Sequence, residues 1–123
     1  MKVNVLSTVY RIKYVPSLDG RGGETDFYTK EIRISEQEDI PAEYKTDNLK
    51  EMQRHVLRHE LIHAFLFESG LSGNSWAANE EIVDWMAHQI PKIVQSLEEA
   101  GLDGCLKRVK GYGKQHQEME KEA

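Results

Sequence analysis

Apolar and charged residues alternate in two segments of the first third of the chain, where residues 10–14 read YRIKY and residues 31–34 read EIRI. Such alternation is typical of half-buried β-strands. The glycine-rich stretch 16–26 between them reads as a turn, which favours an antiparallel pair. Residues 3–6 offer a third strand. Two or three strands are not stable alone, so we expect helices to cover one face of the sheet.

A helical period replaces this alternation near residue 48. Apolar residues and histidines then recur at three- and four-residue steps, at Met52, Val56, His59, Ile62, His63 and Leu66. Asn48 is a good N-cap and forms an N-x-x-E relative of the capping box with Glu51. Ser69 and Gly70 supply a stop signal. The pattern therefore predicts one helix of about 20 residues.

A second helix is predicted to begin after Asn79, another good N-cap. One face of this segment is apolar and consists of Val83, Met86, Ala87, Ile90 and Val94. Pro91 should kink the helix or break it in two.

The remaining chain reads as helical over residues 92–109, with an interruption at 101–104, and as a polar tail over residues 111–123. The predicted fold is α+β, a single domain over residues 1–110. In it a short antiparallel sheet of two or three strands packs on the two helices.

The first predicted helix carries the sequence RHELIHAF at residues 58–65. Residues four apart lie on one helix face, so the rings of His59 and His63 can converge on one metal ion. Zinc accepts imidazole nitrogen at about 2.0–2.1 Å. In this H-E-x-x-H spacing Glu60 lies beside the ion as a base for a water that zinc makes acidic. The alternative is that both histidines are ordinary polar residues at the edge of the core.

A catalytic zinc site usually has a third protein ligand. The extended motif H-E-x-x-H-x-x-G-x-x-H is excluded, because Leu66 and Ser69 stand where it requires Gly and His. A glutamate from the second helix is the alternative, and Glu80 and Glu81 both qualify by position. On a helical wheel Glu80 lies at the margin of the apolar face and Glu81 points to solvent, so Glu80 is favoured.

Asp84 lies one helical turn after Glu80. Its carboxylate is placed to accept a hydrogen bond from a free ring nitrogen of His59 or His63 and so to orient that ligand. The alternative is a solvated acidic face at a helix N-terminus, where carboxylates favour the dipole. The H-E-x-x-H motif upstream favours the first interpretation.

These motifs resemble a known class of enzymes. HELIH at 59–63 followed by NEEIVD at 79–84 resembles the gluzincin pattern of thermolysin-like metallopeptidases. The pattern E-x-x-V-D-x-M-A at 80–87 is also similar to the E-x-x-A-N-x-F-A segment of ImmA/IrrE-type metallopeptidases, common in phages and mobile elements. The resemblance covers residues 48–91 and departs from the ImmA/IrrE pattern where Val-Asp replaces Ala-Asn.

The resemblance implies a zinc metallopeptidase in which His59, His63 and Glu80 bind Zn²⁺ and Glu60 is the general base. Its substrate would be a protein or peptide, and the fold type suggests strand Glu31–Ser35 as an edge along which the substrate extends. Two other classes stay open. One is a zinc-binding regulatory or interaction protein with little or no proteolysis, and the other is a metal-free helical module.

Four further residues are weaker candidates for a role at the site. His88, Tyr112 and His116 are candidate donors to a developing oxyanion, although a surface position is the simpler interpretation of each. His55, one turn before His59, is a candidate metal contact or hydrogen-bond partner, and we favour the second.

Composition and charge indicate which partners and which cellular compartment to expect. The chain has 123 residues, a net charge of −5 and a sequence pI near 5.5, which argues against broad affinity for nucleic acid or anionic membranes. The single cysteine, Cys105, leaves no intramolecular disulfide and fits a reducing compartment. No signal peptide and no apolar run of about 18 residues is found, so we expect a cytoplasmic protein. The sequence predicts no oligomeric state.

Overall fold

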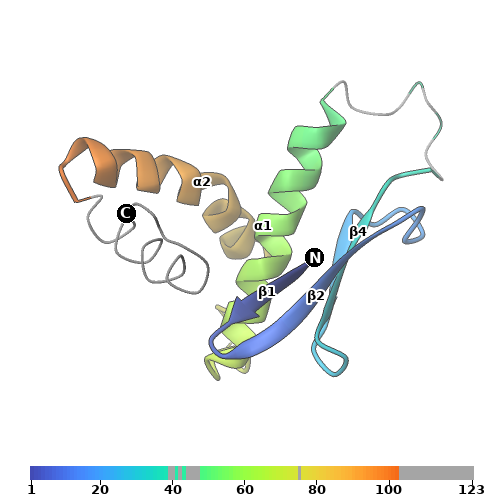
Figure 1. Ribbon diagram of the computed structural model, residues 1–123, viewed down its shortest axis with the longest axis horizontal. Helices are drawn as coiled ribbons and strands as arrows, with labels where there is room; N and C mark the ends of the chain where they lie inside the picture. Colours follow the sequence, from blue (N-terminus) through green and yellow to red (C-terminus); the bar gives the residue numbers. More distant parts are fainter. Residues whose placement is uncertain (39–40, 42, 44–47, 75, 103–123) are drawn as a thin grey trace, which may run out of the picture. The chain divides into compact units, whose positions relative to one another are not determined.

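The computed structural model describes residues 1–38, 41, 43, 48–74 and 76–102 and shows an α+β fold (Figure 1). The elements, in chain order, are β1 (Lys2–Val5), β2 (Thr8–Val15), β3 (Gly23–Asp26), β4 (Glu31–Ser35), α1 (Leu49–Glu68) and α2 (Glu80–Glu99). Residues Met1–His88 form one compact unit, and a second unit begins at Gln89. Cys105 and the predicted tail lie outside the described residues.

The sheet has four strands in the order β1-β2-β4-β3 and is mixed rather than antiparallel. Strands β2 and β4 are parallel, with Arg11 paired to Glu31, so the predicted antiparallel pairing of these two strands is wrong. The reason lies in the glycine-rich stretch, which contains strand β3 and forms an antiparallel hairpin with β4. Because this hairpin reverses the chain once more, β4 enters beside β2 in the same direction, and β4 is not an edge strand.

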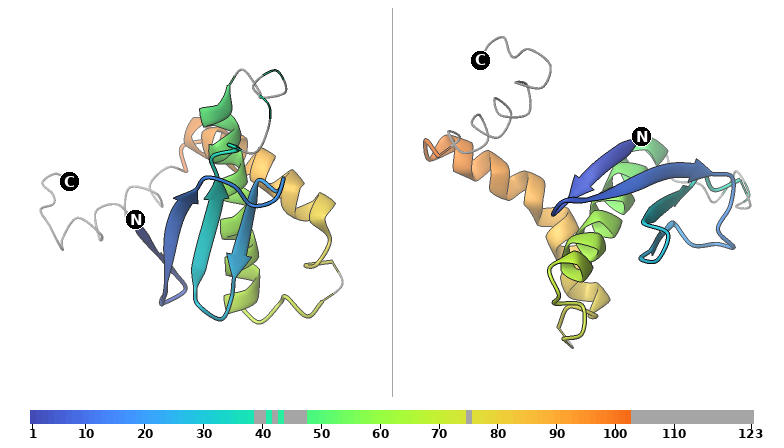
Figure 2. Two further views of the ribbon diagram at one scale, coloured as in Figure 1. Left: turned by 90° about the vertical axis from the view of Figure 1, so that its right-hand side faces the viewer. Right: turned by 60° about the horizontal axis from the view of Figure 1, so that its bottom comes forward.

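One face of the sheet carries the predicted apolar positions and packs against α1. Tyr10 and Ile12 on β2 and Ile32 and Ile34 on β4 are buried, while their neighbours Arg11 and Lys13 are exposed. The same core cluster includes Val5 and Ala64. Figure 2 shows α1 running behind the strands, and it contacts β1, β3 and β4. Alternation along the strands therefore predicted these four buried positions, whereas Tyr14, which continues the same pattern, is exposed.

Both ends of α1 form where local signals predicted them. The amide of Glu51 donates to the side chain of Asn48 at 3.2 Å, which caps the first turn. Gly70 has a φ of 84°, and its amide donates to the carbonyl of Phe67 at 3.0 Å. This left-handed residue closes the helix at low steric cost because glycine has no Cβ.

Glu68, the last residue of α1, ties the helix to the sheet. Its carboxylate accepts hydrogen bonds from Tyr10 at 2.7 Å, Lys30 at 2.8 Å and Thr8 at 3.2 Å. The ammonium group of Lys30, followed by the hydroxyl of Tyr10, lowers the pKa of Glu68 despite partial desolvation. The carboxylate therefore helps to hold the register of α1 against β2.

Helix α2 is capped as predicted but is not broken at Pro91. The amide of Ile82 donates to Asn79 Oδ1 at 3.0 Å, and the helix continues through Pro91 to Glu99. Proline has no amide proton to donate to the carbonyl four residues earlier, which is that of Ala87. The side chain of Arg58 on α1 donates to this carbonyl instead, at 2.9 Å. No helix within the described residues is both long and apolar enough to cross a bilayer.

Candidate metal centre

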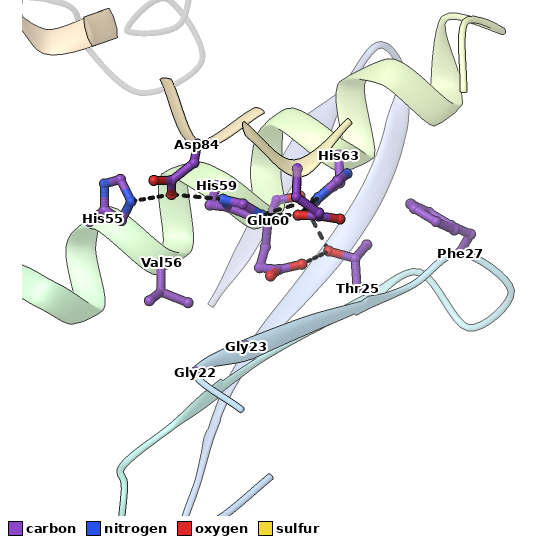
Figure 3. Close-up of a pocket in the computed structure, with 11 residues that line it drawn as sticks. Gly22, Gly23, Thr25, Phe27, His55, Val56, His59, Glu60, His63 and Asp84 are labelled. Carbon is purple, nitrogen blue, oxygen red and sulfur yellow. Dashed lines mark hydrogen bonds and ion pairs between the residues drawn. The ribbon is translucent and has the colours of Figure 1, made fainter. Parts of the chain in front are cut away.

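Two histidines of α1 and the first residue of α2 converge on one point. The Nε2 atoms of His59 and His63 are 3.2 Å apart, and Glu80 Oε1 lies 2.9 Å from the first and 3.2 Å from the second. Figure 3 shows the two rings turned toward the same side of α1. The three residues form a group that could hold a metal ion.

The positions of the ring protons show how such a group could hold a cation. His59 Nδ1 lies 3.2 Å from Asp84 Oδ1, and a carboxylate there requires the ring proton on Nδ1. In a neutral ring His59 Nε2 then carries a lone pair that faces the carboxylate of Glu80 and the ring of His63. A bound cation satisfies these converging acceptors without a second proton on His59.

The structure places Glu80, and not Glu81, beside the two histidines. Glu80 belongs to the group with His59 and His63, whereas Glu81 is exposed and belongs to neither possible metal group among the described residues. Partial burial opposes the ionisation of Glu80, but hydrogen bonds and charge from His59 and His63 outweigh it and lower its pKa. The carboxylate side chain is nevertheless 70% exposed, so solvent reaches the centre from this side.

Asp84 supports the centre from one turn further along α2. Its Oδ1 lies 2.7 Å from His55 Nε2 and 3.2 Å from His59 Nδ1. The hydrogen bond from His55, with a smaller contribution from His59, lowers the pKa of Asp84. His55, His59 and Asp84 form a second possible metal group, whose facing atoms also fit hydrogen bonds from the two rings to the Asp84 carboxylate.

Glu60 lies in the same cavity and is held by the sheet. It is only 8% exposed, and its Oε1 accepts a hydrogen bond of 2.6 Å from the hydroxyl of Thr25 on β3. Glu60 belongs to neither possible metal group within the described residues. Its position beside the histidines matches the sequence prediction, while its role as a base stays a prediction.

A cavity of about 470 Å³ joins these side chains. Helices α1 and α2 supply His55, Val56, His59, Glu60, His63, Glu80 and Asp84, and the opposite wall consists of Gly22, Gly23, Thr25 and Phe27. A Cβ atom at Gly23 would come within 2.6 Å of Val56 Cγ1 and 3.2 Å of Glu60 Cγ. Glycine at this position therefore allows β3 to approach α1 closely enough to form the wall.

Sequence reasoning missed this wall. The stretch 16–26 was predicted to be a turn, and Thr25 carries no local signal for contact with Glu60. The two adjacent glycines were the one available sign of a close backbone approach.

The remaining candidates lie elsewhere. His88 is exposed, packs against His55 with tilted rings whose centroids are 4.0 Å apart, and lies 3.6 Å from Asp84 Oδ2. It lines a neighbouring cavity and not the one that contains Glu60. Tyr112 and His116 lie outside the described residues.

Comparison of the chain with family models, with curated proteins and with solved structures finds no match.

Proposed function

We propose that this protein is a zinc-dependent metallopeptidase. The observation that carries the proposal is the convergence of His59 Nε2, His63 Nε2 and Glu80 Oε1 within 2.9–3.2 Å of one another, in a cavity that Glu60 also lines. The resemblance of residues 48–91 to gluzincin and ImmA/IrrE-type sequences supports the same conclusion.

The donor set fits zinc. Two imidazole nitrogens and one carboxylate oxygen are the ligands of many catalytic zinc sites, which leave a fourth position for water or substrate. Ligand bonds of about 2.0–2.1 Å in a tetrahedron separate the ligand atoms by about 3.3 Å. The separations found here are close to this value, so little movement is needed to accept the ion.

The chain's own residues supply the proton transfers. Bound zinc would polarise a substrate carbonyl and make water more acidic. Glu60 takes a proton from the attacking water and later delivers it to the leaving amine. The hydroxyl of Thr25 occupies Glu60 Oε1, which leaves the second carboxylate oxygen for this transfer.

The substrate in this proposal is an extended segment of a protein or peptide. Strand Glu31–Ser35 was expected to guide it, but β4 lies between β2 and β3. The strand at this edge of the sheet is β3, which also forms a wall of the cavity. We therefore place the substrate along β3, where backbone hydrogen bonds would extend the sheet by one strand.

The test measures zinc per chain by elemental analysis in the wild type, in Glu80→Ala and in Glu81→Ala. We expect about one zinc in the wild type and in Glu81→Ala, and a clear loss in Glu80→Ala, because catalytic sites need the third ligand. The Glu81→Ala variant is the matched control, since it removes the same charge from the same helical turn.

A second measurement separates an enzyme from a zinc-binding regulatory protein. Glu60→Gln should retain zinc and lose about 10²- to 10⁴-fold of the hydrolysis of a quenched fluorogenic peptide library. Zinc in the wild type without any Glu60-dependent hydrolysis would favour the regulatory protein. A wild type that takes up no zinc would contradict both and favour a metal-free helical module.

A further inference from the structure

We infer that His55 is a positioning residue of the metal centre, which fixes the carboxylate of Asp84 and through it the ring of His59. The inference rests on the proposed zinc site and names a contribution to it from outside the ligand set. His55 belongs neither to the H-E-x-x-H motif nor to the converging group of His59, His63 and Glu80.

Asp84 can orient the ring of His59 only if its own carboxylate is held in one orientation. Its side chain is 47% exposed on the surface of α2, where a short carboxylate has several rotamers open to it. Its shortest hydrogen bond goes to His55 at 2.7 Å, whereas the bond to His59 measures 3.2 Å. The direction of Oδ1 is therefore determined chiefly by His55.

His55 is the more rigid partner. Its side chain is 19% exposed, and its ring packs at a tilt of 34° against that of His88, with centroids 4.0 Å apart. Its Nδ1 is buried and has no hydrogen-bond partner among the described residues, so a proton there would be left unsatisfied. The ring therefore carries its proton on Nε2 and donates it to Asp84.

His55 acts on the ligand His59 through Asp84 Oδ1, the oxygen that both rings contact. With Oδ1 held in place, His59 donates from Nδ1 and presents the lone pair of Nε2 to the metal position. Loss of the bond from His55 releases Asp84 toward solvent and weakens this preorganisation. Outer partners of this kind typically change metal affinity by about 10- to 100-fold when they contact the ligand directly. We expect a smaller change, about threefold to tenfold, one bond further away.

The test replaces His55 by glutamine or by asparagine, whose amide groups imitate different ring nitrogens of histidine. The amide nitrogen of glutamine reaches the position of Nε2, and that of asparagine reaches only the position of Nδ1. Zinc affinity of the full chain is measured by competition with a chromogenic chelator for the wild type, His55→Gln, His55→Asn and His55→Leu. The absorption spectrum of the cobalt(II) form reports the ligand geometry, and thermal unfolding of the metal-free proteins checks that each one is folded.

We expect His55→Gln to bind zinc within about twofold of the wild type and the other two variants to lose about threefold to tenfold, with altered cobalt spectra. Equal affinity in all four proteins would overturn the inference while leaving the zinc site intact. Equal losses in His55→Gln and His55→Asn would also overturn it, because position-specific donation would then not matter. Absence of zinc binding in the wild type would instead overturn the proposed function, and the inference with it.

Discussion

Thr25 is the residue through which the sheet holds the buried carboxylate of Glu60. Its hydroxyl has one proton and lies 2.6 Å from Glu60 Oε1 and 3.3 Å from the main-chain oxygen of the same residue. The shorter contact takes the proton, so the side chain of Glu60 and not its backbone is stabilised by this donor.

Thr25→Val, which keeps the shape and removes the hydroxyl, should lower the free energy of unfolding by about 1–3 kcal/mol. The physical reason is that a buried carboxylate oxygen loses its donor. Urea denaturation of the metal-free protein measures the change, and Thr25→Ser is the control that retains the hydroxyl. A Thr25→Val protein as stable as the wild type would show that the bond contributes nothing.

Individual residues of the centre were predictable to different degrees. His59 and His63 share one helix face in any fold that keeps α1, so their spacing alone brings the rings together. Glu80 could be distinguished from Glu81 because only one of them borders the apolar face of α2. Thr25 could not be predicted, since its contact with Glu60 depends on how closely β3 approaches α1.

At the scale of elements, a side chain of α1 supplies a hydrogen bond that Pro91 removes from α2. Pro91 leaves the carbonyl of Ala87 without its helical donor, and Arg58 Nε supplies one at 2.9 Å. Ala87 is fully buried, so water is a poor substitute for this donor.

Arg58→Met should therefore destabilise the protein by about 0.5–1.5 kcal/mol in the presence of Pro91. In a Pro91→Ala background the same change should have a smaller effect, because an amide proton at position 91 then serves the carbonyl of Ala87. A double-mutant cycle of unfolding free energies measures this coupling. Equal effects of Arg58→Met in both backgrounds would show that the two residues act independently.

Helix boundaries were predictable from the sequence, and strand pairing was not. The caps of α1 and α2 depend on Asn48, Gly70 and Asn79, whose effects are confined to one turn. Strand β3 reads GETD, which has no apolar alternation and begins with glycine. Without β3 the chain between β2 and β4 reads as a single reversal, and the parallel pairing of those strands cannot be derived.

At the scale of the whole molecule, carboxylates paired across elements make the fold sensitive to acid. The pKa of Glu68 is lowered by Lys30, and the pKa of Glu31 is lowered by Lys13. A carboxyl group with a lowered folded-state pKa stabilises the fold above its unfolded pKa, and this contribution disappears as the pH falls through the folded value.

For Glu68 the contribution is complete above its ordinary pKa of 4.5 and is lost below it. Glu68→Gln should therefore lower stability at neutral pH and make the decline less steep as the pH falls below 4.5. Urea denaturation across this range measures the slope, with Glu98→Gln on exposed α2 surface as the control of equal charge. Parallel curves for Glu68→Gln and the wild type would contradict the assignment.

The parallel pairing of β2 with β4 also has a kinetic consequence. The β1–β2 and β3–β4 hairpins each join neighbouring segments, whereas the β2–β4 pairing joins Arg11 to Glu31 across the whole of β3. Contacts between distant positions require closure of a longer loop and form more slowly than hairpin contacts. The contacts of β3 with α1 span a still longer stretch of the chain, since Thr25 and Glu60 are 35 residues apart. Because the cavity wall forms only when β3 lies against α1, the candidate metal cavity should be complete only among the last events of folding.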